Sequence, residues 1–450
     1  MILATKGVNH AIQLYSFGRQ ISSLRCINMS TINLRYGEKQ ITLDTSGAKS
    51  IETLAGVQKP AIVDLPLAFR QAVEDKCIST APLKSLLSSD DQVTIIISDI
   101  TRFWMRQNQI CPLLVDYLCD DIGVPHENVT ILVALGTHRF QTESEMKTLV
   151  TNDVFQKIKV VNHDCHADDL VCLGTTSRGN DIFVNPLVTG GRKVIAISGT
   201  SHHLMSGFSG GRKSILPGIC GFETIRRNHV ASLDPHLPKS NPLIGMGNLK
   251  RNPVHEDMDE AAALVNPLFG INIAINGEGQ ISRLMAGDFK ATWEESCREC
   301  QESMGLKIAE KADMVVVSCG GFPKDMNLYQ GCKALINASR AVKDGGEIVF
   351  LAECKEGGGT AAFFDWIKPL REGRLDAALR ENFTIDGYIF YAFCEAMEKR
   401  SVYMLTEIPE ENLEGMPIRV YHDVDTLLRD VNFAGKSVYV IPYGGNTVPF

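Results

Sequence analysis

The sequence lacks several patterns that would assign it to a common class. No apolar run reaches the roughly 18 residues of a membrane-spanning helix, so we expect no membrane protein. The 13 cysteines have neither disulfide nor zinc spacing, which favours reduced thiols in a cytoplasmic protein. Positive charge is not in excess either, since the formal net charge is −8. This balance argues against nucleic acid or an anionic membrane as the partner.

Nucleotide-binding fingerprints are also missing. No GxGxxG followed by a ribose-binding acidic residue occurs at a suitable place, which counts against a nicotinamide-dependent dehydrogenase. GFSGGRKS, starting at Gly207, approaches the P-loop pattern GxxxxGK[ST], but Arg212 stands where the second glycine is required. Nucleoside-triphosphate binding is therefore disfavoured.

The 450 residues predict more than one domain. Residues 1–37 contain no Asp or Glu, and Met29 opens a strand-like segment, so 1–28 is expected to be an extension that adds nothing to the fold. It would be non-native or disordered, with a targeting segment as the alternative. We predict an N-terminal catalytic and cofactor-binding domain over 29–290, a helical connector over 291–310, a second α/β domain over 311–430, and a strand and turn over 431–450 that return to the body.

Short apolar runs alternate with helical patterns along the chain. VTIIISD (93–99), VTILVALGTH (129–138) and KVIAISGTSHH (193–203) are expected strands, and 314–321 and 346–354 start a second unit after a break at 269–279. This alternation predicts an α/β fold of two domains, each with a helix-covered, largely parallel sheet. Polar residues follow three of the runs, where open α/β sheets gather their ligands. We expect the active site in the cleft between the domains.

The segment from Gly199 to His229 concentrates glycines, histidines and a lysine. Gly207, Gly210 and Gly211 permit close backbone approaches, and a glycine-rich turn leading into a helix can cradle a phosphate. Arg212 and Lys213 would add positive charge. The alternative is a glycine-rich surface turn with incidental basic residues.

Three of the eleven histidines stand apart because they lie in glycine-containing turns: His138, His203 and His229. Histidine can exchange a proton near neutral pH and is also a common metal ligand. His163 sits among carboxylates and is expected to pair with Asp164, while His255 is expected to cap a helix. Gln330 and Lys333 lie three apart and would share one face of a helix.

Four separated motifs resemble the nickel-pincer lactate racemase family over nearly everything from Met29 onward. They are SDITR (98–102), LGTHR (135–139), SHHLMSGFSGGRKSILPGI (201–219) with the downstream Asn228 and His229, and DMNLYQGCKAL (325–335). Members of that family use a nickel-pincer pyridinium-3,5-bisthiocarboxylic acid mononucleotide, in which two sulfurs and a ring carbon hold the nickel.

The resemblance implies roles for individual residues. Lys213 would carry the cofactor covalently, His229 would complete a square-planar nickel site, and His138 and His203 would be the acid/base pair. The remaining cofactor-binding residues would be Asp99, Ile100, Thr101, Arg102, Ser206, Gly207, Ser209, Gly210 and Gly211. The substrate would be held by Arg102, Tyr329, Gln330 and Lys333.

The implied reaction is the racemisation of a small 2-hydroxy acid, with D- and L-lactate as the first candidates. A neighbouring carboxylate stabilises a C2 carbanion poorly, so hydride transfer replaces proton abstraction, and two histidines serve the two enantiomers. Cofactor-assembly proteins are implied as partners. The alternatives are racemisation or epimerisation of malate, an aryl-lactate, hydroxyglutarate or a sugar acid, a nicotinamide-dependent dehydrogenase, and a non-catalytic cofactor carrier. Tyrosine and phenylalanine within 388–393 are the candidates for an aromatic pocket wall.

Overall fold

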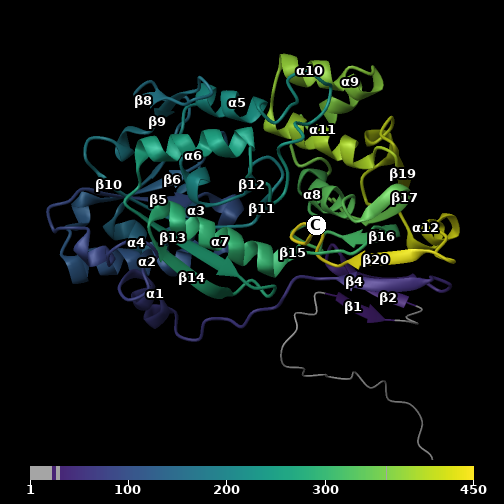
Figure 1. Ribbon diagram of the computed structural model, residues 1–450, viewed down its shortest axis with the longest axis horizontal. Coiled ribbons are helices and arrows are strands. Elements are labelled where there is room, and N and C mark those ends of the chain that lie inside the picture. The colour runs from purple at the N-terminus through teal and green to yellow at the C-terminus, as the bar shows by residue number, and fades with distance from the viewer. Residues whose placement is uncertain (1–22, 27–30, 361) are drawn as a thin grey trace, which may run out of the picture.

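Two lobes, each built on a large sheet, make up the protein (Figure 1). The computed structural model describes residues 23–26, 31–360 and 362–450. The α/β class predicted from the alternating pattern is confirmed, because both sheets are largely parallel and carry helices between their strands.

The first sheet has six strands in the order β14-β13-β10-β5-β6-β7. Only β14 runs antiparallel to its neighbour. The apolar runs expected to be strands form β5, β6 and β10, and the segment expected to be a break is instead strand β13, paired in parallel with β10. The strands are β5 (Val93–Ser98), β6 (Val129–Ala134), β7 (Lys159–Asn162), β10 (Lys193–Gly199), β13 (Phe269–Ile275) and β14 (Ile281–Gly287).

The second sheet has seven strands in the order β1-β4-β20-β16-β17-β18-β19. All neighbours are parallel except β1 and β4. The strands are β1 (Ser23–Cys26), β4 (Ser50–Leu54), β16 (Ala312–Ser318), β17 (Val342–Leu351), β18 (Ser401–Leu405), β19 (Ile418–Tyr421) and β20 (Ser437–Ile441). Short two-stranded sheets pair β2 (Thr31–Tyr36) with β3 (Lys39–Asp44), β8 (Val171–Thr175) with β9 (Asp181–Val184), β11 (His202–His203) with β12 (Gly207–Phe208), and β15 (Gly305–Leu306) with β21 (Val448–Pro449).

The helices begin at side-chain caps in most cases; for example, Asn252 caps α6 and Asn327 caps α8. They are α1 (Leu65–Val73), α2 (Gln107–Asp116), α3 (Glu143–Val150), α4 (Asn152–Lys157), α5 (Phe222–Val230), α6 (Pro253–Val265), α7 (Phe289–Met304), α8 (Leu328–Ala338), α9 (Ile367–Arg371), α10 (Leu375–Glu381), α11 (Ile385–Met397) and α12 (Val424–Asp430). Among the described residues, none of the helices has the length and apolar character that crossing a membrane requires.

The sheet topology differs from the predicted domain boundaries. Residues 31–54, expected in the first domain, pack against the second sheet, and β4 joins it beside β20. Strand β1 lies within the predicted 1–28 extension and pairs with β4, while residues 1–22 lie outside the described part. Figure 1 shows these purple strands in the green and yellow lobe. The pairing is non-local, so the sequence pattern near residue 29 carries no sign of it.

Both sheets bring loops together where the strand order reverses. In the first sheet this point lies between β5 and β10, and in the second it lies between β16 and β20. Loops at the carboxyl ends of strands on either side of such a point diverge and leave a crevice that binds ligands in open α/β folds. The predicted site residues follow β5, β6, β10 and β16, so the topology brings them to these crevices.

The membership of β4 in the second sheet predicts a stability effect. Ile51 is buried among Val438 and Val440 of β20, and we expect Ile51→Ala to lower the free energy of unfolding by about 3 kcal/mol. The fully exposed Val63 provides the control, since Val63→Ala should change it by less than about 0.5 kcal/mol. Urea unfolding measures both. Equal stability of the two variants would show that β4 does not contribute to that core.

Candidate active site

The glycine-rich loop after β10 is shaped by close packing. A Cβ on Gly210 would lie 2.8 Å from the Gly199 carbonyl oxygen, and one on Gly211 would lie 2.3 Å from the Trp293 ring. Both glycines, like Gly207, have positive φ angles. Inside the loop, Ser201 N–H donates to Ser209 Oγ over 2.8 Å. These positions therefore require glycine for packing reasons, whatever the loop binds.

The side chains of Lys213 and His203 contact each other directly. Lys213 Nζ lies 2.8 Å from His203 Nε2. The backbone N–H groups of Met205 and Ser206 point to His203 Nδ1 over 3.2 and 3.3 Å, so the proton of the neutral ring is on Nε2. That N–H faces the lysine, and only an unprotonated amine can accept it. The contact therefore implies a neutral Lys213.

The electrostatics of the cluster agree with this reading. Burial and then the charges of Arg102, Arg212 and Lys333 hold the pKa of Lys213 well below its usual range. Burial also lowers the pKa of His203, with further lowering from Lys213, His229, Arg102 and Lys333. For Lys333, burial followed by Arg102 and Lys324 lowers the pKa to about 7. Cations from both lobes thus crowd one place, which suits an anionic ligand.

His229 lies on α5 and is 3% exposed. Its Nδ1 donates to the Ile225 carbonyl oxygen over 2.9 Å, so the lone pair of the neutral ring is on Nε2. Burial, followed by the charge of Lys213, lowers its pKa to about 3. A neutral imidazole with a free nitrogen, oriented by a backbone carbonyl, is the form that binds metals.

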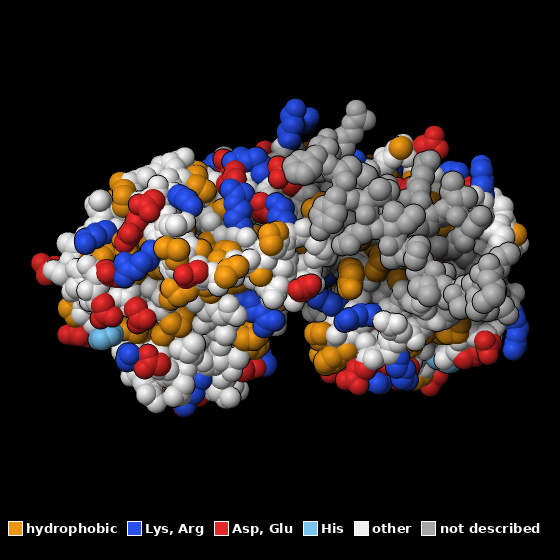
Figure 2. Space-filling view, turned by 90° about the horizontal axis from the view of Figure 1, so that it is seen from below, with side chains coloured by type: hydrophobic (Ala, Val, Ile, Leu, Met, Phe, Trp, Pro, Cys, Tyr) orange, Lys and Arg blue, Asp and Glu red, His pale blue; other side chains and the backbone are white. Residues whose placement is uncertain are grey.

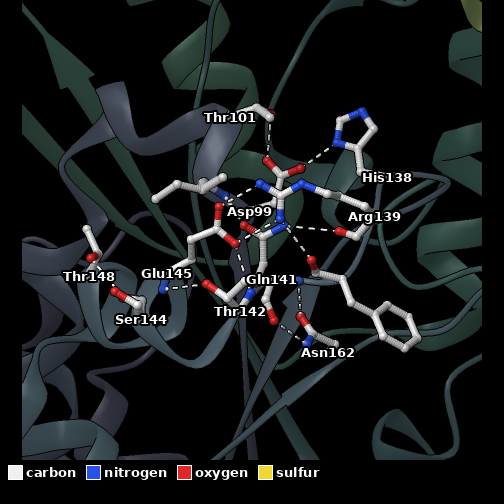
Figure 3. Close-up of polar contacts among 12 residues, drawn as sticks. Asp99, Thr101, His138, Arg139, Gln141, Thr142, Ser144, Glu145, Thr148 and Asn162 are labelled. Atoms are coloured by element: carbon white, nitrogen blue, oxygen red, sulfur yellow. Dashed lines mark hydrogen bonds and ion pairs between the residues drawn. The ribbon is translucent and has the colours of Figure 1, made fainter. Parts of the chain in front are cut away.

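Asp99 and His138 come together from the ends of β5 and β6. Figure 3 shows the Asp99 carboxylate between the Thr101 hydroxyl and the His138 ring, and both contacts are hydrogen bonds. Burial opposes ionisation, but the His138 bond, the charges of His138 and Arg102 and the Thr101 bond lower the pKa of Asp99. Asp99 is only 2% exposed, whereas the His138 side chain is 41% exposed. The carboxylate therefore orients an imidazole that remains accessible.

The loop that carries His138 is fixed by amide contacts (Figure 3). Gln141 Oε1 accepts from the Ile100 N–H over 3.0 Å, and Gln141 exchanges two further hydrogen bonds with Asn162. Arg139 is held by two bonds to Glu145. These contacts join the ends of β5, β6 and β7, and Gln141 was not recognised from the sequence because it belongs to none of the quoted motifs.

Helix α8 supplies the second lobe's part of the cluster. Lys333 Nζ donates to Gln330 Oε1 over 2.7 Å, which confirms their shared face, and Lys333 lies 5.9 Å from the centre of the Tyr329 ring. Lys324, in the loop before the helix, is a further nearby cation that sequence reasoning missed. Seen from below in Figure 2, the surface is notched between the two lobes, with basic side chains near the notch.

Several predicted contacts are different in the structure. Arg212 does not extend the positive charge of the open loop; it is 1% exposed and points to His255 and Trp293. His255 therefore accepts from Arg212, and the cap expected of it is supplied by Asn252. The hydroxyl of Ser206 is likewise turned inward, to the Phe208 carbonyl oxygen.

His163 and the candidate aromatic wall belong to the core. His163 is fully buried and bonds the Cys220 carbonyl oxygen over 2.9 Å, so it does not pair with Asp164. Tyr388 and Phe393 are also fully buried, and the Tyr388 hydroxyl is hydrogen-bonded to Ser240 over 2.9 Å, beside a cavity that Tyr388 and Ser240 both line. Phe363 instead packs edge-on against Tyr329, 6.1 Å between ring centres. The sequence gives only periodicity, which does not separate a buried aromatic from one that faces a ligand.

The donor set fits the expected nucleotide. Among the described residues, no group of three or more His, Cys, Asp or Glu could hold a metal ion, so a metal at His229 needs donors from another molecule. A pincer nucleotide carries three of its own. Thr200 Oγ1 is buried beside the glycine loop with no hydrogen-bond partner, and it offers a donor to a phosphate there.

Comparisons with known proteins point the same way. The lactate racemase N-terminal domain family matches residues 36–239, and the C-terminal domain family matches residues 308–448. Lactate racemase from Thermoanaerobacterium thermosaccharolyticum is 32% identical over 350 residues, 76% of this chain and 79% of that protein. Lactate racemase from Lactiplantibacillus plantarum is 30% identical over 342 residues, 75% of this chain and 78% of that protein.

Two solved structures are similar in fold. The lactate racemase apoprotein of T. thermosaccharolyticum superposes with a TM-score of 0.81 at 28% identity, covering 93% of this chain and all of that one. A Thermotoga maritima protein has a TM-score of 0.62 at 17% identity, with 88% and 99% covered. The second likeness concerns the fold alone.

Buried neutral histidines predict acid sensitivity of the apoprotein. Burial lowers the pKa of His202 to about 4 and those of His229 and His255 to about 3, against about 6.5 in an unfolded chain. Below pH 6.5 the unfolded chain binds more protons, so stability falls as the pH decreases from 6.5 toward 4. Each histidine should contribute up to about 1.4 kcal/mol per pH unit.

Urea unfolding at pH 7 and pH 5 measures this slope. His202→Gln should remove the share of one histidine, because glutamine does not titrate. Unchanged stability of the wild type between the two pH values would contradict the assignment of neutral buried rings.

Proposed function

Because this chain belongs to the lactate racemase family, we propose that it interconverts the enantiomers of a short-chain 2-hydroxy acid, with D- and L-lactate as its substrates. One observation supports the proposal most strongly: the neutral Lys213–His203 pair lies among Arg102, Lys333 and the metal-competent His229. These groups come from both lobes, and we place the active site in the cleft between them.

Lys213 and His229 are the residues that would hold the nickel-pincer nucleotide. The unprotonated amine of Lys213 would suit a covalent attachment, and the free Nε2 of His229 would suit a ligand to the nickel. Gly207, Ser209, Gly210 and Gly211 line the loop proposed for its phosphate. When bound, the nucleotide supplies an acceptor and donor of hydride.

His138 and His203 would act as the proton-transfer pair. One imidazole accepts the proton of the substrate hydroxyl as C2 becomes planar, and the other serves the opposite enantiomer. Asp99 would orient the His138 ring, since its carboxylate is buried and hydrogen-bonded to His138 Nδ1. In the apoprotein the His203 proton is on Nε2, so His203 would accept a substrate proton at that nitrogen only after its own proton has moved to another group.

Substrate binding is assigned to cations and to α8. Arg102 and Lys333 would hold the carboxylate and keep the 2-oxo acid in place while it turns, with Gln330 and Tyr329 beside them. Lys324 lies close enough to favour a second candidate, a 2-hydroxy acid with an additional anionic group such as malate. A cytoplasmic location and cofactor-assembly partners belong to the same proposal.

A chiral assay tests the reaction. The protein co-expressed with cofactor-assembly enzymes and nickel should racemise single enantiomers of lactate, and Lys213→Ala should abolish both the activity and a covalent adduct found on the Lys213 peptide by mass spectrometry. Malate, phenyllactate and a sugar acid serve as comparison substrates. An adduct without activity on any of them would reject the substrate class, and the absence of an adduct would reject the cofactor.

Isotope retention separates hydride transfer from proton abstraction. Racemisation of lactate in D2O should leave protium at C2, because the transferred hydrogen does not exchange with solvent. Nuclear magnetic resonance of the product measures this directly. Deuterium at C2 after one turnover would contradict hydride transfer, whichever histidine acts as the base.

A further inference from the structure

Arg212 is a fully buried cation directly before Lys213, and the function proposed above assigns it no part. It is 1% exposed and opens the short 3-10 helix Gly211–Ser214 together with Gly211. Its side chain contacts the glycine-rich loop, α6 and α7. A buried arginine costs solvation energy, so its retention calls for a specific partner set.

The partners of Arg212 lie on the glycine-rich loop itself and on the two helices packed against it, α6 and α7. One Nη donates to the Ser206 carbonyl oxygen over 2.6 Å, with longer contacts of 3.4 Å to that of Phe208. Nε donates to His255 Nδ1 over 2.7 Å. The guanidinium lies 3.8 Å from the centre of the Trp293 ring, a cation–π contact. The side chain therefore joins both ends of the loop to α6 and α7.

Trp293 completes this support from α7. Its ring lies where a Cβ of Gly211 would be, and its Nε1 donates to the Ser209 carbonyl oxygen over 2.9 Å. The planar, five-donor guanidinium can stack on this ring and bond two carbonyls at once. A lysine keeps the positive charge but lacks the planar guanidinium and its paired N–H donors. Arg212→Lys therefore tests the effect of the side-chain geometry without removing the charge.

Backbone hydrogen bonds connect the Arg212 side chain to the Lys213–His203 contact. Ser206 N–H bonds His203 Nδ1, and Ser206 C=O is held by Arg212, so one residue joins the guanidinium to the imidazole that faces the lysine. Lys213 N–H bonds the Gly210 carbonyl oxygen over 3.1 Å, which fixes its backbone to the same loop. The Arg212 guanidinium is thus linked to His203 through Ser206, and the Lys213 backbone is bonded to the same loop.

We propose that Arg212 is a positioning residue that, clamped between Trp293, His255 and the loop carbonyls, aims the Lys213 amine at His203 and keeps it available as a nucleophile. This inference rests on the proposed function in one respect only, the identity of the cofactor that becomes attached to Lys213. In the part of the chain that the structure describes, the hydrogen-bond and ring partners of Arg212 are neutral groups, and the Asp259 carboxylate acts on it only at longer range.

The test is the pH profile of Lys213 labelling in the apoprotein. Protein made without cofactor-assembly enzymes is reacted briefly with trinitrobenzenesulfonate between pH 5 and 10, and the Lys213 peptide is quantified by mass spectrometry. Wild-type Lys213 should react at pH 7, where exposed lysines are protonated. Arg212→Lys and His255→Ala should raise the midpoint by at least about one unit and lower the rate at pH 7 about tenfold for each unit.

The same labelling experiment includes a control variant. Arg226→Lys alters an exposed arginine paired with Glu223 and should leave the profile unchanged. A wild-type profile in both test variants, with only a lower melting temperature, would reduce Arg212 to packing and overturn the proposal. A shift in Arg212→Met but not in Arg212→Lys would also overturn it, since charge alone would then suffice.

The milder His255→Ala variant keeps the test valid if changes at Arg212 prevent folding. Labelling needs no nickel or nucleotide, so failure of the proposed function appears separately, as a missing adduct on Lys213 in the wild-type protein after co-expression. A normal adduct together with an unreactive Lys213 in the wild-type apoprotein would overturn the positioning role alone.

Discussion

The contact between Lys213 and His203 is the constraint on which the site depends. An imidazole N–H that faces a lysine requires an unprotonated amine, and this is stable only where burial and neighbouring cations disfavour another positive charge. The charges of Arg102 and Lys333 act on both members of the pair. The result is an unprotonated amine beside the positive charges of Arg102 and Lys333, an environment that favours an anionic ligand.

The strand order of the two sheets brings the residues of this cluster together. The loops after β5, β6 and β10 carry Asp99, His138 and His203, and the loop after β16 leads into α8 with Lys333. In the first sheet the strand order reverses between β5 and β10, with β6 beside β5, and in the second it reverses between β16 and β20, so both groups of loops start at or next to such a point. The glycine-rich loop after β10 also differs from a P-loop. Arg212 stands where a P-loop has its second glycine, and its side chain packs on Trp293 and bonds the Ser206 carbonyl oxygen of the loop.

Local patterns in the sequence predicted much of this arrangement. Apolar runs gave β5, β6, β10 and β16 because buried parallel strands are continuous and short, and the spacing of Gln330 and Lys333 gave their shared helix face. The placement of β4 and β1 in the second sheet could not be predicted, since it depends on pairing across nearly 400 residues. The burial of the Arg212 side chain could not be predicted either. A basic residue next to a glycine-rich loop gives the same sequence pattern whether its side chain faces a ligand or packs on a tryptophan.

The most direct test of the account is the protonation state of His203 in the apoprotein. Nitrogen-15 nuclear magnetic resonance of labelled histidine rings, assigned with His203→Gln, distinguishes the two neutral tautomers from the charged ring. His203 should be neutral at pH 7 with its proton on Nε2, and it should stay neutral well below pH 6.5. A ring that titrates near pH 6.5, or carries its proton on Nδ1, would contradict the neutral amine of Lys213 and with it the chemistry built on that contact.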